Sequence, residues 1–383
     1  MNIDQLVGYL DKPDNAEVWL RSMGLENLSR AHGNLAHIAA SGITLDLVAS
    51  LASQLTEHLP QTSYPDMALN NLDRFITAAR NPLSLGTLWE RDDQALPTLL
   101  QIFSTSQHLT DLLIRDPESY DLLRLTEGQP VARDQLVAEI CSEISTMSKD
   151  SDVVAALRRY KDRETLRIAY GDIVRHQHIN TVTRQISFLA DAICEAATRS
   201  ARQKLEKKRG IPRDADGQPA EFVIMALGKL GGSELNYSSD IDLVFLYRGE
   251  GKTDGERSVS NQEFFQRLVK NIVSLLTESS PAGAVYRVDL RLRPNGKQGA
   301  SVMSIGAALR YYDVSGRTWE RQAFVKARPI AGAIQLGKRF LKKMEPWVYR
   351  RYLSGSEITE IKALKRRIEK NSQQQGDAEL NVK

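Results

Sequence analysis

Apolar residues recur at helical spacing up to about residue 210, and from there to about residue 300 they gather in short runs. In the first part Leu, Ala, Glu, Arg and Gln dominate and Gly is sparse, a composition that favours helices. The clearest helices are predicted over 151–170 and 180–208. The second of these carries one apolar stripe, formed by Val182, Ile186, Leu189 and Ile193.

The middle of the chain alternates strand-like and helix-like patterns. Short apolar runs over 222–227 and 241–247 predict buried strands, and the alternation over 284–293 predicts a third. Between the second and the third, residues 260–263 read Ser-Asn-Gln-Glu, the signature of a helix start, and a helix is predicted to follow. From about Ile305 the pattern becomes helical again. The chain is therefore predicted to be α+β and predominantly helical.

Three regions are expected from this organisation. Residues 1–110 form an N-terminal helical region, and 111–325 form the central domain, in which helices precede an α+β core at about 220–300. Residues 326–383 begin a further helical region. Because 371–383 are polar, Gln-rich and without a core-forming pattern, we expect the sequence to be a fragment of a longer protein.

The composition narrows the protein class. A hydrophobic share of 42% and a charged share of 26% are ordinary for a soluble globular protein, and the net charge of +3 gives no broad basic field for nucleic acid. No apolar run reaches the ~20 residues that cross a bilayer, and the N-terminus does not resemble a secretory signal. The two cysteines, Cys141 and Cys194, have no metal-ligand spacing. We therefore expect a cytoplasmic protein that binds neither membrane nor nucleic acid.

The candidate chemistry centres on two aspartates. Asp240 and Asp242 are two residues apart on a predicted strand, so both carboxylates point to one face while Ile241 and Leu243 point to the core. Adjacent carboxylates raise each other's pKa, and a divalent cation removes that repulsion. Their hard oxygen atoms favour Mg²⁺ or Mn²⁺.

The third predicted strand supplies partners for this pair. Strict alternation would set Arg287, Asp289, Arg291 and Arg293 on one face. Asp289 is then predicted to be the third metal ligand and the third catalytic carboxylate. Arginines suit phosphate oxygens, and Arg291 and Arg293 are predicted to bind them.

A glycine-rich turn precedes the aspartates. Gly231, Gly232 and Ser233 are predicted to bring backbone N–H groups close to a phosphate, and Ser239 is a further predicted nucleotide contact. In the order strand, Gly-Gly-Ser turn, Asp-x-Asp, helix and Asp, these parts match metal-dependent phosphoryl or nucleotidyl transfer.

Three segments resemble the bifunctional glutamine synthetase adenylyltransferase/adenylyl-removing enzymes. They are 228–242, which includes Gly-Lys-Leu-Gly-Gly and Asn-Tyr-Ser-Ser-Asp-Ile-Asp; 286–294, Tyr-Arg-Val-Asp-Leu-Arg-Leu-Arg-Pro; and 316–328, which includes Trp-Glu-Arg. The resemblance is strong over about 160–330 and thin before residue 110. It implies a nucleotidyltransferase core like that of DNA polymerase β, flanked by helical segments.

The resemblance also implies a reaction. The residues around the aspartates and the Trp-Glu-Arg segment resemble the N-terminal, adenylyl-removing half of the family, although Gln322 stands where an aromatic residue is expected. That half removes AMP from a tyrosine of glutamine synthetase by phosphorolysis, releasing ADP, with Mg²⁺ or Mn²⁺ as cofactor. The implied partners are glutamine synthetase, phosphate or ADP and, in the full-length enzyme, a PII-type nitrogen-regulatory protein. Lys229, Lys326 and Arg328 are further candidate phosphate contacts, with salt-bridged structural roles as the alternative for the last two.

Two other functions remain open at this point. The same scaffold supports ATP-dependent adenylylation of the same target, and a regulatory docking module would need no activity of its own. Three metal-type carboxylates argue against the second alternative, because a docking module does not require them.

Overall fold

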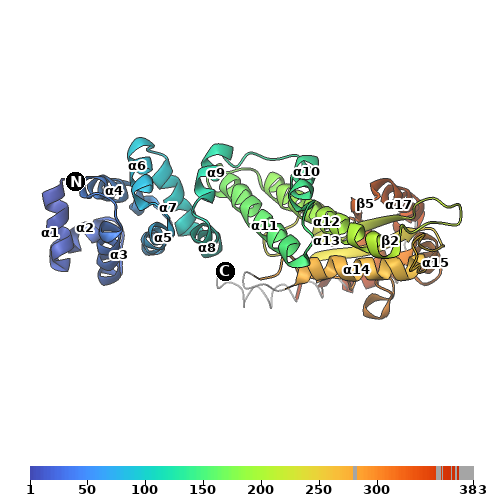
Figure 1. The fold of residues 1–383 in the computed structure, drawn as a ribbon. Helices are drawn as coiled ribbons and strands as arrows, with labels where there is room; N and C mark the ends of the chain where they lie inside the picture. The colour runs from blue at the N-terminus through green and yellow to red at the C-terminus, as the bar shows by residue number, and fades with distance from the viewer. Residues whose placement is uncertain (279–282, 351–354, 356, 364, 367–368, 371–383) are drawn as a thin grey trace. The chain divides into compact units, whose positions relative to one another are not determined.

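The computed structural model describes residues 1–278, 283–350, 355, 357–363, 365–366 and 369–370. It divides into two compact units, the first made of 1–130 with 165–182 and the second of 131–164 with the described residues from Thr183 onward (Figure 1). The predicted boundaries at residues 110 and 325 differ from this division. The polar ending predicted at 371–383 lies outside the described residues.

The first unit is built from short helices whose ends are set by local sequence. Proline occupies the first turn of three of the α-helices, where its missing N–H would have no acceptor within the helix. Asparagine or serine side chains cap four of the α-helices, one of which also begins with proline. The elements are α1 (Ile3–Asp11), α2 (Pro13–Ser22), α3 (Leu28–Ala40), α4 (Leu45–His58), η1 (Leu59–Gln61), α5 (Pro65–Ala78), α6 (Pro82–Arg91), α7 (Ala95–Thr105), α8 (Gln107–Arg115) and α9 (Ser119–Thr126). Their apolar faces pack into one core, in which Phe75 contacts Phe103 and Tyr120.

The second unit combines helices with a small sheet. Its long helices include α11 (Asp150–Ile173) and α12 (Ile179–Arg209), each of which also contributes residues to the first unit. The other elements are α10 (Arg133–Ile144), β1 (Glu221–Ala226), α13 (Gly228–Gly231), β2 (Ile241–Arg248), α14 (Asn261–Thr277), β3 (Val288–Asp289), η2 (Gly296–Gln298), β4 (Met303–Ser304), α15 (Ile305–Ser315), α16 (Thr318–Phe324), β5 (Arg328–Gly332) and α17 (Ile334–Val348).

The sheet is mixed and has the order β3-β2-β1-β5, with β4 also paired to β2. Strand β1 runs antiparallel to both β2 and β5, whereas β3 and β4 run parallel to β2. The two parallel partners meet β2 at its opposite ends, β3 at Ile241 and β4 at Leu246. The start and the end of β2 therefore have different neighbours.

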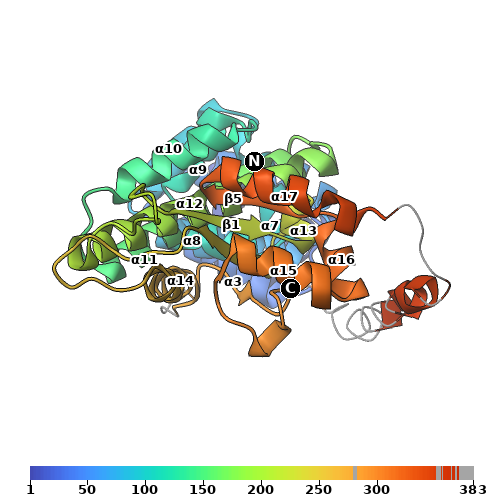
Figure 2. The ribbon, with the colours of Figure 1, turned by 90° about the vertical axis from the view of Figure 1, so that its right-hand side faces the viewer.

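Helices cover both faces of the sheet. On one face Val223 and Met225 pack with Tyr312 of α15, Phe324 of α16 and Phe340 of α17. Figure 2 shows the ribbons of these three helices beside the strands. The opposite face carries an aromatic cluster, in which Phe265 of α14 stacks on the rings of both sheet residues Phe222 and Tyr247. Alternate residues of β1 therefore enter two different cores, which explains why this strand is apolar along nearly its whole length.

The main elements predicted from sequence are confirmed. The structure has both long helices, the strands near 222 and 241, and the helix after Ser260, whose hydroxyl accepts a hydrogen bond from Glu263 N–H at 3.2 Å. A predominantly helical α+β fold is therefore confirmed. The third predicted strand is much shorter than the alternation suggested, and β5 was not predicted. Within the described part of the chain, no helix has the length and apolarity to span a membrane.

The contact between α17 and the sheet depends on a glycine. A Cβ atom on Gly337 would lie 2.5 Å from Cβ of Pro329 and 3.0 Å from Sδ of Met225. Gly337→Ala should therefore lower the free energy of unfolding by about 1–3 kcal/mol, as overpacking generally does. Gly33→Ala in the interior of α3, where nothing lies within 4 Å of the new methyl, should instead raise it by about 0.5–1 kcal/mol. Urea unfolding of both variants checks the contrast, and equal effects would contradict the packing argument.

Candidate active site

The predicted carboxylates meet at the start of β2. Asp242 is the second residue of that strand, and the parallel pairing places it opposite Asp289 of β3. Asp240 immediately precedes β2 and is exposed, whereas Asp242 is partly buried. Ile241 and Leu243 are fully buried, so the intervening carboxylate points away from the core. The structure therefore brings together the three aspartates that sequence reasoning selected.

The arginines near these carboxylates do not lie as the sequence predicted. Strand β3 ends at Asp289, and the chain then turns, so the expected single face of alternating charges does not exist beyond that residue. Arg291 folds back, donating from its backbone N–H to Asp289 Oδ1 at 2.8 Å and from Nε to Oδ2 at 2.7 Å. Arg293 donates to the carbonyls of Leu290 and Gly299 and therefore stabilises its own loop.

Arg287 forms an ion pair with Asp240, although the sequence suggested no specific role for this arginine. The Nε atom of Arg287 donates to Asp240 Oδ1, and Nη2 donates to the carbonyl oxygen of Ser238 at 2.7 Å. Two of the three carboxylates are thus paired with arginine. Among the described residues, no three His, Cys, Asp or Glu side chains are arranged as a metal-ligand group.

The three carboxylates have different electrostatic environments. Burial raises the pKa of Asp242 to about 6, and the negative charges of Asp289 and Asp240 add to the rise. Hydrogen bonds from Arg291 hold the pKa of Asp289 below its usual value. Asp242 is thus the carboxylate whose charge is least compensated by the protein. A half-buried carboxylate with like-charged neighbours is an environment that a divalent cation would stabilise.

The glycine-rich turn packs against the carboxylates rather than opening toward them. Gly228 has φ +57° and lies so close to the carboxylate of Asp242 that a side chain there would collide with it. The N–H groups of Gly231, Gly232 and Ser233 donate to the carbonyls of 227, 228 and 230. These N–H groups close a helical turn and so have acceptors within the protein, and their contact with a phosphate stays a prediction. Gly231 is required because a Cβ atom there would collide with the carbonyl oxygen of Lys326.

Comparison with known proteins decides the family. Residues 96–343 match the family model described as glutamate-ammonia ligase adenylyltransferase. The chain belongs to this family. It is 34% identical over 319 residues to a bifunctional glutamine synthetase adenylyltransferase/adenylyl-removing enzyme of Thioalkalivibrio sulfidiphilus, covering 82% of this chain and 32% of the relative. The enzymes of the same description from Hahella chejuensis and Pseudomonas aeruginosa are 37% and 34% identical, over 75% and 87% of this chain and 30% and 34% of the relatives. The chain therefore spans about a third of the length of these relatives.

In this member of the glutamate-ammonia ligase adenylyltransferase family, a buried ion-pair network supports the glycine-rich turn. Asp191 of α12 is fully buried and accepts hydrogen bonds from Nη1 and Nη2 of Arg328 and from Nε of Arg133. Nη2 of Arg328 also donates to the carbonyl oxygen of Leu230 at 3.0 Å. Burial raises the pKa of Asp191, and the two arginines oppose that shift. Arg328 therefore positions α13 and has the salt-bridged role considered as the alternative from sequence.

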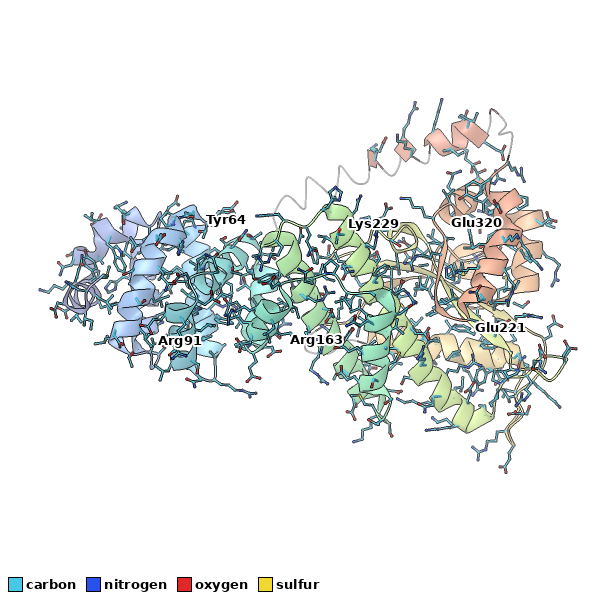
Figure 3. The ribbon with its side chains drawn as sticks, turned by 90° about the horizontal axis from the view of Figure 1, so that it is seen from above. Tyr64, Arg91, Arg163, Glu221, Lys229 and Glu320 are labelled. Atoms are coloured by element: carbon cyan, nitrogen blue, oxygen red, sulfur yellow. The ribbon has the colours of Figure 1, made fainter. Side chains whose placement is uncertain are left out.

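The remaining candidates lie at the border of the site. The Nζ atom of Lys326 pairs with the carboxylate of Glu234, which follows the turn. Lys229, labelled in Figure 3, follows β1, and its positive charge opposes the rise in the pKa of Asp242, so this ammonium group acts on that carboxylate. Ser239 directly precedes Asp240 and is partly buried. Lys229 thus acts on Asp242 through its charge and forms no ion pair with a carboxylate that the structure describes.

Sequence reasoning missed three residues that shape this site. Asp191 and Arg133 belong to the buried network, and Gly228 makes room for the carboxylate of Asp242. Asp191 had one detectable signal, because it is a lone acidic residue in the apolar stretch from Ile186 to Ile193. A charged residue in such a stretch is expected to have a buried partner.

Proposed function

We propose that this chain is a metal-dependent nucleotidyltransferase, with a core like that of DNA polymerase β, that removes AMP from a tyrosine of glutamine synthetase by phosphorolysis. The observation that carries the proposal is the placement of Asp242 opposite Asp289 on neighbouring parallel strands, with Asp240 two residues away. Membership of the family supports the target, because the relatives are described as acting on glutamine synthetase.

The cofactor is proposed from the donor set. Asp240, Asp242 and Asp289 would hold Mg²⁺ or Mn²⁺, since carboxylate oxygens are the ligands these ions prefer. When bound, such ions neutralise phosphate charge and stabilise the leaving oxygen. The raised pKa of Asp242 supports the fit, because the protein itself leaves that charge poorly compensated.

The reaction requires positioning more than acid–base chemistry. An oxygen of inorganic phosphate attacks the AMP phosphorus, the bond from phosphorus to the tyrosine oxygen breaks, and the phenolate takes a proton from water, so the products are ADP and free tyrosine. Arg287 and Arg291 are exposed beside the carboxylates and can reach phosphate oxygens of a substrate bound there. Lys229 adds a third positive charge at the same edge. Catalysis would then come from holding two anions together in the correct orientation.

The carboxylates provide the main test. In Asp240→Asn with Asp242→Asn, phosphate-dependent release of ADP from adenylylated glutamine synthetase should fall about a thousand-fold or more, because the metal ligands are lost. Asp313→Asn, which changes an exposed aspartate of α15, serves as the matched control and should retain activity. Circular dichroism shows whether each variant is folded. Unchanged ADP release by the folded double variant would contradict the proposal.

The direction of transfer is tested separately, because the relatives are described as catalysing both addition and removal. Removal is favoured by the residues that flank the aspartates, 236–239, and by Trp319-Glu320-Arg321, which resemble the removing half. Adenylylated glutamine synthetase labelled in the AMP group is incubated with phosphate, and unmodified glutamine synthetase with labelled ATP. We expect labelled ADP in the first reaction and no labelled protein in the second. The reverse result would favour adenylylation.

A further inference from the structure

A second concave surface lies at the other end of β2. It is a groove of about 490 Å³ between the end of β2, the start of α15 and one face of α17. Asp242 and Arg248 mark the two ends of the strand and are six residues apart, which corresponds to about 20 Å along a strand. On β1 the antiparallel pairing sets Glu221 opposite Arg248, and Lys229, also labelled in Figure 3, follows the other end of that strand. The groove is therefore distinct from the carboxylate site.

The groove has an apolar floor. Leu336 and Phe340 of α17 are buried beneath it, and Ile305 and Leu309 of α15 are partly buried. These four side chains come from two helices that also pack on each other over the sheet. An organic group placed here would contact apolar atoms from both helices.

The rim of the groove is positively charged. Four exposed cations line it, Arg248, Arg310, Arg339 and Lys343, against the single carboxylate of Glu250. They come from three different elements, so their convergence is a product of the fold. Ser304, Ile305 and Gly306, at the start of α15, also line the groove, and there the helix dipole adds to the positive potential.

Only part of this charge is balanced within the protein. Arg248 and Arg339 both pair with Glu221, at 3.3 and 3.0 Å. Arg310 and Lys343 have no ion pair with any residue that the structure describes. The Nη1 atom of Arg310 lies 3.6 Å from the Cβ position of Gly306, so its guanidinium group is held over the first turn of α15. Two cations of the rim are thus available to a ligand.

We propose that this groove binds a small organic anion, with its apolar part on the floor and a carboxylate or phosphate group on Arg310 and Lys343. The volume lies within the range of about 300–1,000 Å³ that is usual for small-molecule sites. An apolar floor with a few convergent charged groups is also the usual composition of such sites. The anionic group would relieve the repulsion among the four cations, which the protein balances only in part.

The test uses 1-anilinonaphthalene-8-sulfonate, an aromatic anion whose fluorescence rises on apolar contact. The full chain is titrated in EDTA, so that no metal bridges the probe to the carboxylates. We expect one saturable site, whose affinity falls at least tenfold in Arg310→Gln with Lys343→Gln. The matched control is Lys338→Gln with Lys342→Gln, which removes two exposed lysines of α17 that do not line the groove. The control should change the affinity by less than twofold.

Competition identifies the anionic group, because benzoate and phenyl phosphate carry the same ring with a carboxylate or a phosphate. Displacement by either one supports the proposal, and the stronger competitor names the preferred group. All the substituted side chains are exposed, so we expect folded variants, and circular dichroism verifies this. Equal probe affinity in the two double variants, or no saturable binding by the unmodified chain, would overturn the proposal.

Discussion

Replacing Arg328 with glutamine should lower the free energy of unfolding by about 3 kcal/mol, the usual loss when one partner of a buried ion pair is removed. Asp191 is fully buried, and Arg328 supplies two of the three arginine hydrogen bonds that it accepts. The variant would leave a buried carboxylate with Arg133 as its remaining arginine partner. The carbonyl of Leu230 would lose a donor as well. Because Leu230 belongs to α13, the turn beside Asp242 should loosen, and ADP release should slow at least tenfold.

Two variants separate this network from ordinary surface pairs. Asp191→Asn combined with Arg328→Gln removes both charges, so urea unfolding should show that it recovers most of the lost stability. Arg267→Gln breaks an exposed pair with Glu263 on α14, and such a pair contributes at most about 0.5 kcal/mol. If Arg328→Gln is no more destabilising than Arg267→Gln, the network does not have the role assigned to it.

The carboxylates could be predicted from sequence because their geometry is local or follows from strand order. Asp240 and Asp242 are two residues apart at the start of a strand, so their shared direction needs no tertiary information. The prediction that Asp289 lies near them required only that β3 lie beside β2, and the observed pairing of Asp242 with Asp289 confirms that placement. Patterns of this kind are fixed by the backbone.

The arginines and the glycine-rich turn could not be predicted in the same way. Alternation indicates which face a side chain occupies only while the strand continues, and β3 ends at Asp289. Arg291 and Arg293 then follow a turn, and their partners are set by that turn. The N–H groups of Gly231 and Gly232 are used within a helical turn, which a Gly-Gly sequence does not distinguish from an open anion-binding loop.

The edge strand β5 shows a second reason for failure. Its sequence, 328–332, contains Pro329 and begins with a charged residue, features that argue against a strand. In the sheet this strand lies at the edge, beside β1, where a proline can be accommodated, and its pairing shifts register at that point. Arg328 is charged because it reaches Asp191 on a helix 137 residues away in sequence. The sequence of the strand alone does not indicate such a distant partner.

The site should also carry a stability cost, which Asp242→Asn would reveal. In metal-free protein the pKa of Asp242 is raised from 3.8 to about 6. The folded state therefore binds more protons than the unfolded state between these pH values, and stability falls as the pH rises through that window. Above pH 6 the penalty is constant and, after allowance for partial solvent exposure, amounts to about 2 kcal/mol. In EDTA at pH 8, Asp242→Asn should be more stable than the unmodified chain by this amount, and the difference should shrink toward zero as the pH approaches 4.

Saturating Mg²⁺ should reverse this order. An ion present at a hundredfold excess over its dissociation constant stabilises the folded state by about 2.7 kcal/mol, and the unmodified chain alone retains all three carboxylates. Urea unfolding at pH 8 with EDTA or Mg²⁺ measures both effects. Equal stabilisation of the two proteins by Mg²⁺ would show that Asp242 is not a ligand, and equal stability in EDTA would show that its burial carries no cost. We therefore expect Asp242 to destabilise the metal-free fold and to stabilise the metal-bound fold. This is the behaviour of a residue that is retained for the reaction rather than for folding.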